Sequence, residues 1–325
     1  MFHLDEEAVH AALPWRAAVD ALRAAHATQA KPFEDVGVFD APDGTGDQFV
    51  NLTSWSPSRM IGVKMVGVFP RNARLPAPEP NIQGLVALFD GTTGRALMTC
   101  DGAALTYRKT AADSALGSDL LARPDARVLA IAGAGGLAPH VVEAHCAVRP
   151  IERVIVWNRT RASAEAMAET LRVPGREVLV VDDLTPHLPE ADIVSAVTMA
   201  RSPVIAGAAL KPGAHVDLVG AYLPDMREAD SDTVRRAGRM FTDNRQAFAA
   251  SADGAGPVAE GLIAGPVADY FDLCTGRHPG RQSATEITVC KNGGGGHLDL
   301  FLAEYLYDQT NRQPLADRTG ALPLV

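Results

Sequence analysis

The stretch RVLAIAGAGGLAPH, residues 127–140, decides the fold of this chain. Its apolar run stops at four small residues, 133–136, and apolar character then resumes. The spacing is G-x-G-x-x-A, formed by Gly133, Gly135 and Ala138. Alone this pattern is weak, because an alanine-rich chain also forms it by chance. Its meaning therefore depends on the segments that flank it.

Strands and helices are expected to alternate through the second half of the chain. The apolar runs are RVLAIA, RVIVW, EVLVV, ADIVSAVT, AHVDLVGA and RMFTD, and the spacing predicts helices over residues 137–148 and 162–171. Near-continuous apolar strands that alternate with helices are typical of a parallel sheet covered on both faces. We therefore predict an α/β fold, with a Rossmann-type doubly wound parallel sheet over residues 119–297.

The glycine turn then lies between a strand and a helix, which favours a dinucleotide site. Gly133 allows the tight turn, Gly135 lets the backbone approach a pyrophosphate, and Ala138 lets the helix pack closely on the sheet. Gly136 and Leu137 complete the turn at the helix N-terminus. A strand-to-helix turn that binds nothing would carry the same residues, so the alternative is purely structural.

The residues after the next strand bear on which dinucleotide binds. RVIVW is followed by Asn158, Arg159, Thr160 and Arg161. A cofactor without a 2′-phosphate would favour an acidic residue here for its ribose hydroxyls. Guanidinium and hydroxyl groups would instead bind a 2′-phosphate. The run predicts NADPH, with NADH as the second choice, although an exposed basic start to a helix would look the same.

The first half of the chain has a different texture. Residues 5–29 have helical spacing, and residues 36–106 contain short apolar runs separated by turn clusters, which predicts a mostly antiparallel sheet. A helix rich in alanine is expected over residues 106–121, and a final helix over residues 298–310, after four consecutive glycines. This half is predicted to be a mixed α+β domain.

Composition and charge argue against several classes of protein. The 325 residues suffice for two domains with full cores, and the net charge of −9 disfavours nucleic acid or an anionic membrane as partner. No apolar run approaches the ~20 residues of a membrane span, and the acidic N-terminus does not resemble a secretory signal. The four cysteines lie far apart without a CxxC pair. We expect a cytoplasmic protein with reduced thiols and no metal site.

Several segments together resemble the ornithine cyclodeaminase/μ-crystallin family, and within it most the Δ1-pyrroline-2-carboxylate (ketimine) reductases. They are GVKMVGVFPRN, the run from LVALFDGTTGRAL to SDLLARPD, GAGGLA, VIVWNRT and LKPGAHVDLVGAYLPDMREAD. The resemblance implies a homodimer formed by a substrate-binding domain, residues 1–118, to which residues 298–325 return. The Rossmann domain lies between these two segments.

The resemblance also implies which side chains bind the substrate. Lys64 matches the family lysine that faces the substrate carboxylate, and Lys109 matches the arginine of the family's Arg-Thr-Ala-Ala, so both are candidate catalytic residues. Arg108 and Thr110 flank the second position, and Asn72 follows the strand of the first; these are candidate substrate-binding residues. A lysine buried without an anion is costly, so the alternative for Lys64 is an edge strand with its ammonium in water.

The chain departs from the family pattern at three places. Lys109 keeps the charge of the arginine but loses its bidentate fork. Glu34 stands where relatives often carry an arginine for the carboxylate. Tyr222 stands where cyclodeaminases and alanine dehydrogenases carry an aspartate, and a tyrosine hydroxyl is a poor base at neutral pH. We nevertheless expect Tyr222 to line the substrate pocket. The nearby Glu228 is interpreted mainly as a residue of the following turn and helix start, with a role in the pocket as the alternative.

Three further residues are candidates for the cofactor site. Thr198 ends the run ADIVSAVT, at the edge of the predicted sheet where a nucleotide would bind. Asn292 and Gly293 begin the glycine-rich loop that resembles the family loop near the nicotinamide. Four glycines would let the backbone approach a flat ring closely, and a hinge would explain them equally well.

The function that the resemblance implies is hydride transfer to the imine carbon of a small cyclic imino acid. The substrate would be Δ1-pyrroline-2-carboxylate or Δ1-piperideine-2-carboxylate, and the product L-proline or L-pipecolate. Alternatives are an ornithine cyclodeaminase, which Tyr222 and the basic run at residues 158–161 disfavour, an amino-acid dehydrogenase of the same family, and a protein that only binds the nucleotide.

Overall fold

The computed structural model describes residues 1–312, and within it the chain forms two compact units. Unit 1 contains Met1–Ala25, Gln29–Lys109 and the chain from Gly295 on, and unit 2 contains His26–Thr28 and Thr110–Gly294. The sequence placed the corresponding boundaries after residues 118 and 297. Residues 313–325 of the predicted returning segment lie outside the described part of the chain.

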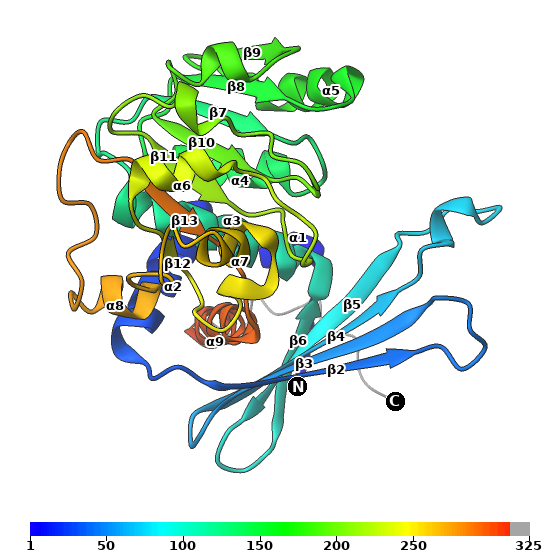
Figure 1. Cartoon of the computed structure of the whole chain (residues 1–325). Helices are drawn as coiled ribbons and strands as arrows, with labels where there is room; N and C mark the ends of the chain where they lie inside the picture. The colour runs from blue at the N-terminus through cyan, green and yellow to red at the C-terminus, as the bar shows by residue number, and fades with distance from the viewer. Residues whose placement is uncertain (313–325) are drawn as a thin grey trace. The chain divides into compact units, whose positions relative to one another are not determined.

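Unit 2 is built on a seven-stranded sheet in which every paired strand is parallel. The spatial order is β12-β13-β11-β10-β7-β8-β9 (Figure 1). The strands are β7 (Val128–Ala132), β8 (Arg153–Trp157), β9 (Glu177–Val181), β10 (Ile193–Ala196), β11 (His215–Leu218), β12 (Phe241–Thr242) and β13 (Thr288–Lys291). Order reverses beside β7, as in a doubly wound nucleotide-binding sheet. The predicted fold class is confirmed, and only β13 was missed.

The helices of unit 2 cover this sheet and close its core. They are α3 (Gly102–Leu121, shared with unit 1), α4 (Ala138–Val148), α5 (Arg161–Leu171), α6 (Ser231–Ala237), α7 (Ala252–Ala259) and α8 (Tyr270–Cys274), with short 3₁₀ turns at Thr185–His187, Gly207–Ala209 and Phe248–Ala250. Strands β10 and β11 are wholly buried and β7 and β8 are buried at their centres, with Ile155, Val194 and Val216 in one apolar cluster. Apolar residues on both faces of each strand explain why these segments read as continuous runs.

The helices at the two ends of the antiparallel half differ from the expected ones. The region predicted as one helix forms α1 (Glu6–Ala12) and α2 (Trp15–Thr28), because Pro14 cannot continue a helix and instead caps the second one. Helix α3 begins at Gly102, earlier than expected, because the Asp101 carboxylate accepts a hydrogen bond from Ala104 N at 2.7 Å.

Unit 1 is a six-stranded sheet ordered β1-β6-β5-β4-β3-β2. The strands are β1 (Phe2–Leu4), β2 (Phe33–Asp40), β3 (Gln48–Ser56), β4 (Met60–Val68), β5 (Ile82–Asp90) and β6 (Ala96–Asp101). All pairs are antiparallel except β1 with β6. A 3₁₀ turn, Asn72–Arg74, lies between β4 and β5. The predicted antiparallel texture is therefore present, with one parallel strand added at the edge.

One face of this sheet is covered by α9 (Gly296–Arg312). A Cβ added to Gly62 on β4 would lie 3.2 to 3.4 Å from Leu300 atoms, so the glycine lets the helix pack directly on the strand. On the same face, register places Glu34 opposite Ser54 and Ser54 opposite Gly62. Lys64, two residues after Gly62, points to that face as well. The start of α9 thus lies over the polar positions of the sheet.

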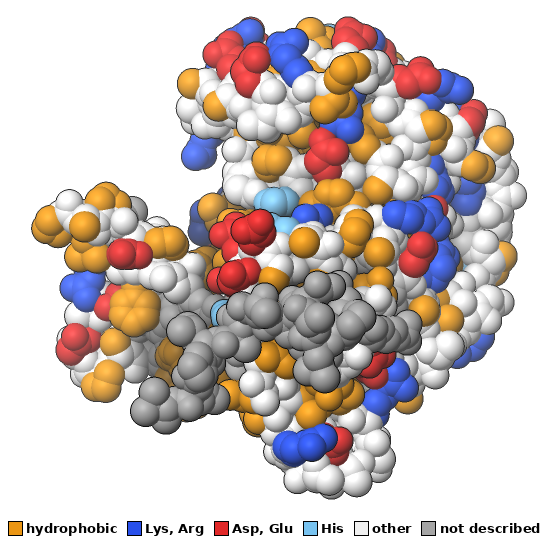
Figure 2. All heavy atoms as spheres, turned by 180° about the vertical axis from the view of Figure 1, so that it is seen from behind, with side chains coloured by type: hydrophobic (Ala, Val, Ile, Leu, Met, Phe, Trp, Pro, Cys, Tyr) orange, Lys and Arg blue, Asp and Glu red, His pale blue; other side chains and the backbone are white. Residues whose placement is uncertain are grey.

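The other face of the sheet is apolar and open. Phe33 pairs with Trp55 and Phe39 pairs with Phe49, and all four rings are exposed. Figure 2 shows hydrophobic side chains gathered on the projecting arm at its left, which β2 to β5 form. Among the helices of residues 1–312, none has the length and apolar character needed to cross a bilayer.

Candidate active site

Two lysines and an aspartate of unit 1 form a buried ionic cluster. Lys64 projects from β4 and Lys109 from α3, and both ammonium groups contact the same oxygen of Asp299, in the first turn of α9. The Nζ–Oδ2 distances are 3.3 Å for Lys64 and 2.6 Å for Lys109. All three residues are less than 10% exposed. The structure thus brings together the two predicted catalytic lysines and adds a carboxylate that sequence reasoning missed.

The two lysines are held differently. Lys109 Nζ also donates to the carbonyl oxygen of Gly295 at 3.2 Å, so two of its donor directions are used. Among the described residues, Lys64 forms its one ion pair with Asp299. Burial and the neighbouring Lys109 charge lower the pKa of Lys64 to about 8, although Asp299 acts in the opposite direction. Both ammoniums lower the pKa of Asp299, against the effect of its burial. The cluster therefore carries two positive charges and one negative charge near neutral pH.

Glu34 occupies the N-terminal end of the same helix. Its Oε1 accepts hydrogen bonds from His297 N at 2.6 Å and from His297 Nδ1 at 3.0 Å. His297 is fully buried, and its hydrogen bonds lower the pKa of Glu34 against the effect of burial. An anion is stable at this position because the first backbone N–H groups of a helix have no partner within it.

The glycine-rich loop is fixed at both ends by carboxylates of the chain. Asp243 accepts hydrogen bonds from Gly293 N at 2.7 Å and Gly294 N at 2.6 Å within unit 2. In unit 1, a Cβ added to Gly296 would lie 2.5 Å from Ser54 Oγ and 3.5 Å from Glu34 Oε1. A side chain at 296 would fit only if the Ser54 hydroxyl moved. The contacts of Gly293 and Gly294 thus lie within unit 2, and those of Gly296 lie within unit 1.

The other predicted substrate-binding residues lie away from this cluster. Arg108, beside Lys109 on α3, donates from Nε to His10 Nδ1 at 2.8 Å and stacks over Trp15 with 3.9 Å from Cζ to the ring centroid. Asn72 lies in the turn after β4 and donates to Pro80 O at 2.9 Å. Thr110 is partly buried and begins the unit 2 part of α3. Within residues 1–312, no side-chain hydrogen bond or ion pair joins Arg108, Thr110 or Asn72 to Lys64 or to Lys109.

The glycine turn after β7 has the geometry of a nucleotide-binding turn. Gly133 has φ +113°, and an added Cβ would lie 2.4 Å from Val197 O. Gly135 is exposed, with no atom within 4 Å of an added Cβ. Leu137 and Gly136 lead into α4, whose first residue, Ala138, is fully buried. A phosphate therefore has clear access to the N-terminus of α4, since the side chains that could block it are absent.

In the basic run after β8, some side chains form hydrogen bonds or ion pairs within the chain and others do not. Asn158 accepts from Ala134 N at 3.2 Å and so joins this run to the glycine turn. Arg161 forms ion pairs with Glu165 and Asp182. Arg159 and Thr160 are exposed, and no hydrogen bond or ion pair of the Arg159 side chain occurs in the described structure. Of the two guanidinium groups, that of Arg159 is the one available to a ligand.

Glu228 joins the ends of β10 and β11. Its Oε1 accepts from Thr198 N at 2.7 Å and from Thr198 Oγ1 at 2.8 Å, and its Oε2 accepts from Gly220 N at 2.8 Å. Burial and the nearby Asp253 raise the pKa of Glu228 to about 7. Tyr222, two residues after Gly220, is 59% exposed. Beyond the turn role expected for Glu228, its carboxylate therefore positions Thr198.

Asn292 is also positioned by the chain itself. Its Nδ2 donates to Asp217 Oδ1 at 2.5 Å, and its Oδ1 accepts from the Tyr270 hydroxyl at 2.9 Å. Asp217 is fully buried and also accepts from Ser195 Oγ at 2.7 Å. The side chain of Asn292 is thus locked in place, which leaves the glycines that follow it as the part of the loop that can approach a ligand.

Four acidic residues that organise these segments were missed or undervalued from the sequence: Asp217, Glu228, Asp243 and Asp299. The signal that could have revealed two of them is an acid inside an apolar run. Asp217 interrupts AHVDLVGA and Asp299 interrupts HLDLFLA. A carboxylate in such a run is costly to bury unless a cation or several N–H groups meet it. Glu228 and Asp243 lie in loops, where no comparable signal exists.

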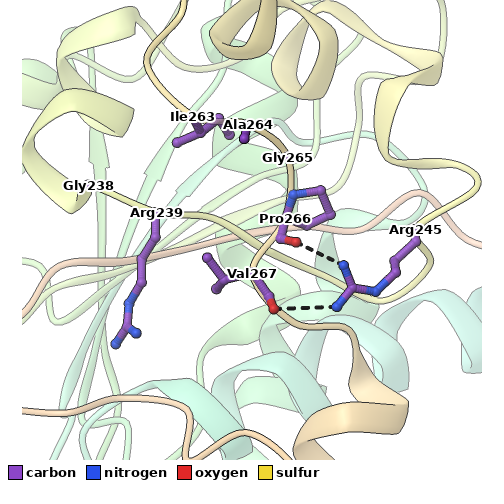
Figure 3. A pocket seen from close by; sticks show the side chains of 8 residues that line it. All are labelled: Gly238, Arg239, Arg245, Ile263, Ala264, Gly265, Pro266 and Val267. Atoms are coloured by element: carbon purple, nitrogen blue, oxygen red, sulfur yellow. Dashed lines mark hydrogen bonds between the residues drawn. The ribbon is translucent and has the colours of Figure 1, made fainter.

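A shallow pocket elsewhere in unit 2 does not offer an alternative site. Figure 3 shows its lining, which includes Arg239, Arg245, Pro266 and Val267. Arg245 donates to the carbonyl oxygens of Pro266 and Val267 at 2.9 and 3.3 Å and pairs with acidic residues, and Arg239 pairs with Glu286. Both guanidinium groups are already engaged within the chain.

Comparisons with known proteins show the family to which the chain belongs. Residues 41–313 match the model of the ornithine cyclodeaminase/mu-crystallin family. A Delta(1)-pyrroline-2-carboxylate reductase of Paracoccus denitrificans is 43% identical over 298 residues, which cover 90% of this chain and 92% of that protein. The structure of the Thermococcus litoralis Delta(1)-pyrroline-2-carboxylate reductase, in complex with NADH and L-proline, is 26% identical, with a TM-score of 0.85 and full coverage of both chains.

A second solved structure is similar to the same degree. The iminosuccinate reductase of Paracoccus denitrificans, in complex with NAD⁺, is 27% identical, with a TM-score of 0.85 and 96% coverage of each chain. The family model spans most of the chain, and the Paracoccus reductase of known sequence is similar over nearly all of it. The chain therefore belongs to the ornithine cyclodeaminase/mu-crystallin family, as its quoted segments predicted.

Proposed function

We propose that the protein reduces a small cyclic imino acid with a nicotinamide cofactor. The substrates are Δ1-pyrroline-2-carboxylate or Δ1-piperideine-2-carboxylate, and the products L-proline or L-pipecolate. The observation that carries the proposal is the buried pair of ammonium groups, Lys64 and Lys109, with the single counter-ion Asp299. One positive charge remains to bind a substrate carboxylate. The relatives named as Delta(1)-pyrroline-2-carboxylate reductases support the same reaction.

The lysines would bind and orient the substrate. Lys109 is fixed by Gly295 O and Asp299, whereas Lys64 has donor directions left for the substrate carboxylate. Holding the carboxylate fixes the position of the adjacent imine carbon, and such positioning supplies much of the rate in a reaction of this kind. A bound nicotinamide would supply the hydride. The protein side chains then need only hold the substrate, because its imine is a reactive electrophile once the nitrogen is protonated.

The dinucleotide fits the residues of unit 2. The φ of Gly133, the clear surroundings of Gly135 and the N-terminus of α4 form the pyrophosphate site. Thr198, Asn292 and Gly293 would contribute to the nicotinamide side of the site, with Thr198 positioned by Glu228. We assign a preference for NADPH to Arg159, because its guanidinium is exposed at the end of β8 and Arg161 is engaged by Asp182.

Reduction is favoured over cyclodeamination by the residue at position 222. A cyclodeaminase needs a base close to the reacting carbon. Tyr222 provides a phenol where related cyclodeaminases carry an aspartate, and a hydroxyl group does not replace a carboxylate as the base that receives a proton from the substrate amine.

We also propose that the protein is a homodimer assembled through the open face of the unit 1 sheet. The four exposed rings of Phe33, Phe39, Phe49 and Trp55 form an apolar surface that a single copy leaves in water. Exposed apolar patches of this kind mark interaction surfaces. A second copy of the same face would cover them, since a two-fold interface uses the same patch on both partners.

The first prediction concerns the cofactor. Arg159→Ala should raise KM for NADPH and leave KM for NADH nearly unchanged, because only the contact with the 2′-phosphate is lost. Steady-state kinetics with both cofactors measure this. Arg161→Ala is the matched control and should change the two values much less. Equal losses with NADPH and NADH in the Arg159 variant would show that this side chain has another role.

The second prediction concerns assembly. Light scattering at micromolar concentration should give a mass of at least two chains. Trp55→Glu should shift this mass toward that of one chain, because it buries a charge in the apolar interface. Val173→Glu, at an exposed apolar residue of unit 2, is the control and should remain dimeric. A wild-type protein of one chain under these conditions would refute the proposal.

The third prediction concerns the substrate carboxylate. Lys64→Met keeps the shape of the side chain and removes its charge, and a charge-assisted contact contributes ~1.5–3 kcal/mol. The value of kcat/KM for the imine should therefore fall by roughly ten- to a few hundredfold. NADPH affinity, measured by fluorescence titration, should barely change. Full imine reduction by this variant would mean that the substrate binds elsewhere.

The fourth prediction concerns pH. Lys64, whose pKa is lowered to about 8, is charged below that pH and loses its charge above it. The value of kcat/KM, which reports groups of the free enzyme, should fall as the pH rises through about 8. The Lys64→Met variant should lack this alkaline limb. A limb that persists unchanged in the variant would belong to the substrate imine and would contradict the assignment.

A further inference from the structure

The charges around the proposed substrate site are matched to a single carboxylate, an inference that rests on the proposed function. Lys64 and Lys109 contribute two positive charges and Asp299 one negative charge. One bound carboxylate neutralises the cluster. A second negative group on the same ligand would find no uncompensated cation among these three residues, which are buried and therefore only weakly screened by salt.

The N-terminus of α9, next to this cluster in unit 1, is already occupied by the carboxylate of Glu34. Anions bind well at the N-terminus of a long helix, and α9 extends over Gly296–Arg312. Glu34 Oε1 accepts from both the backbone N and the ring Nδ1 of His297. These two hydrogen bonds lower the pKa of Glu34, so the group is an anion at neutral pH. The chain thus supplies its own carboxylate at this position.

This internal anion lies close enough to the lysines to act on a bound ligand. Lys109 Nζ is 3.2 Å from the carbonyl oxygen of Gly295, and an added Cβ on Gly296, the next residue, would be 3.5 Å from Glu34 Oε1. Standard bond lengths along this path place Glu34 Oε1 no more than about 12 Å from Lys109 Nζ. The charge of Glu34 is therefore within range to repel a second carboxylate on a ligand that the lysines hold, because screening by water is weak among buried groups.

We propose that Glu34 is a specificity-determining residue, which restricts the enzyme to imino acids with one carboxylate by repelling a second one. The side chain acts through its charge: it occupies the anion position at the start of α9 and leaves no cation for another carboxylate. Glu34→Gln preserves the shape and the acceptor for both His297 donors, and it removes only the charge. Discrimination against dicarboxylates should therefore decrease while binding of monocarboxylates stays close to that of the wild type.

The test compares two planar ring acids that cannot be reduced in place of the imine. Pyrrole-2-carboxylate and pyrrole-2,5-dicarboxylate are titrated calorimetrically into the full-length enzyme saturated with NADP⁺. The measured quantity is the dissociation constant of the dicarboxylate divided by that of the monocarboxylate. In the wild type this ratio should be large, because the dicarboxylate binds more weakly. In Glu34→Gln this ratio should fall by about tenfold or more, which corresponds to ~1.4 kcal/mol or more.

Two further variants separate charge from other effects. Glu79→Gln, an exposed residue of unit 1, makes the same chemical change at a distance and should keep the wild-type ratio. Glu34→Asp keeps the charge and should also keep discrimination. An unchanged ratio in Glu34→Gln, or an equal loss in Glu34→Asp, would overturn the role of the charge. Failure of the monocarboxylate to bind the wild type would instead refute the proposed substrate site itself.

Discussion

The contact on which the site depends is the sharing of one carboxylate oxygen of Asp299 by Lys64 and Lys109. Two ammonium groups buried side by side would repel each other and lose their hydration. Apolar neighbours offset neither the repulsion nor the lost hydration free energy. A single aspartate reduces the repulsion without neutralising the pair. The cluster therefore remains cationic in a place where water is scarce, which is the condition under which a charged ligand is bound firmly. Replacing Asp299 by an apolar residue would leave both lysines without an internal counter-ion.

Unit 2 also contains buried carboxylates that each bind several donors, which there are backbone N–H groups instead of lysines. Glu228 accepts hydrogen bonds from the backbone N–H groups of Thr198 and Gly220. Asp243 accepts them from the backbone N–H groups of Gly293 and Gly294. Loops at the edge of a sheet have backbone donors that no strand satisfies, and a buried carboxylate satisfies several of them at once. Order in these loops therefore comes from side chains of distant segments.

The sequence was a reliable guide where the pattern is local and repeated. The apolar strands and the glycine turn predicted the doubly wound sheet, because each strand buries both faces and Gly133 must adopt a positive φ. The break at Pro14 was missed, since the helical spacing continues on both sides of it. Lys64 and Lys109 were identified through the family resemblance. Their partner was not, because Asp299 meets them only through contacts between segments about 190 and 235 residues apart in the chain, which no periodicity records.

The position of α9 at the end of the described chain has a consequence for biosynthesis. Residues 110–294, which form nearly all of unit 2, are made between the strands of unit 1 and the helix that covers them. At typical translation speeds this takes roughly 10 to 40 s. Throughout that time the nascent sheet has its α9 face uncovered and its lysines without their counter-ion. Unit 2 can complete its sheet during translation, whereas unit 1 matures only after release of residues 296–312 from the ribosome. Its folding is consequently slow and dependent on long-range contacts, and it is the step at which chaperones have most time to act.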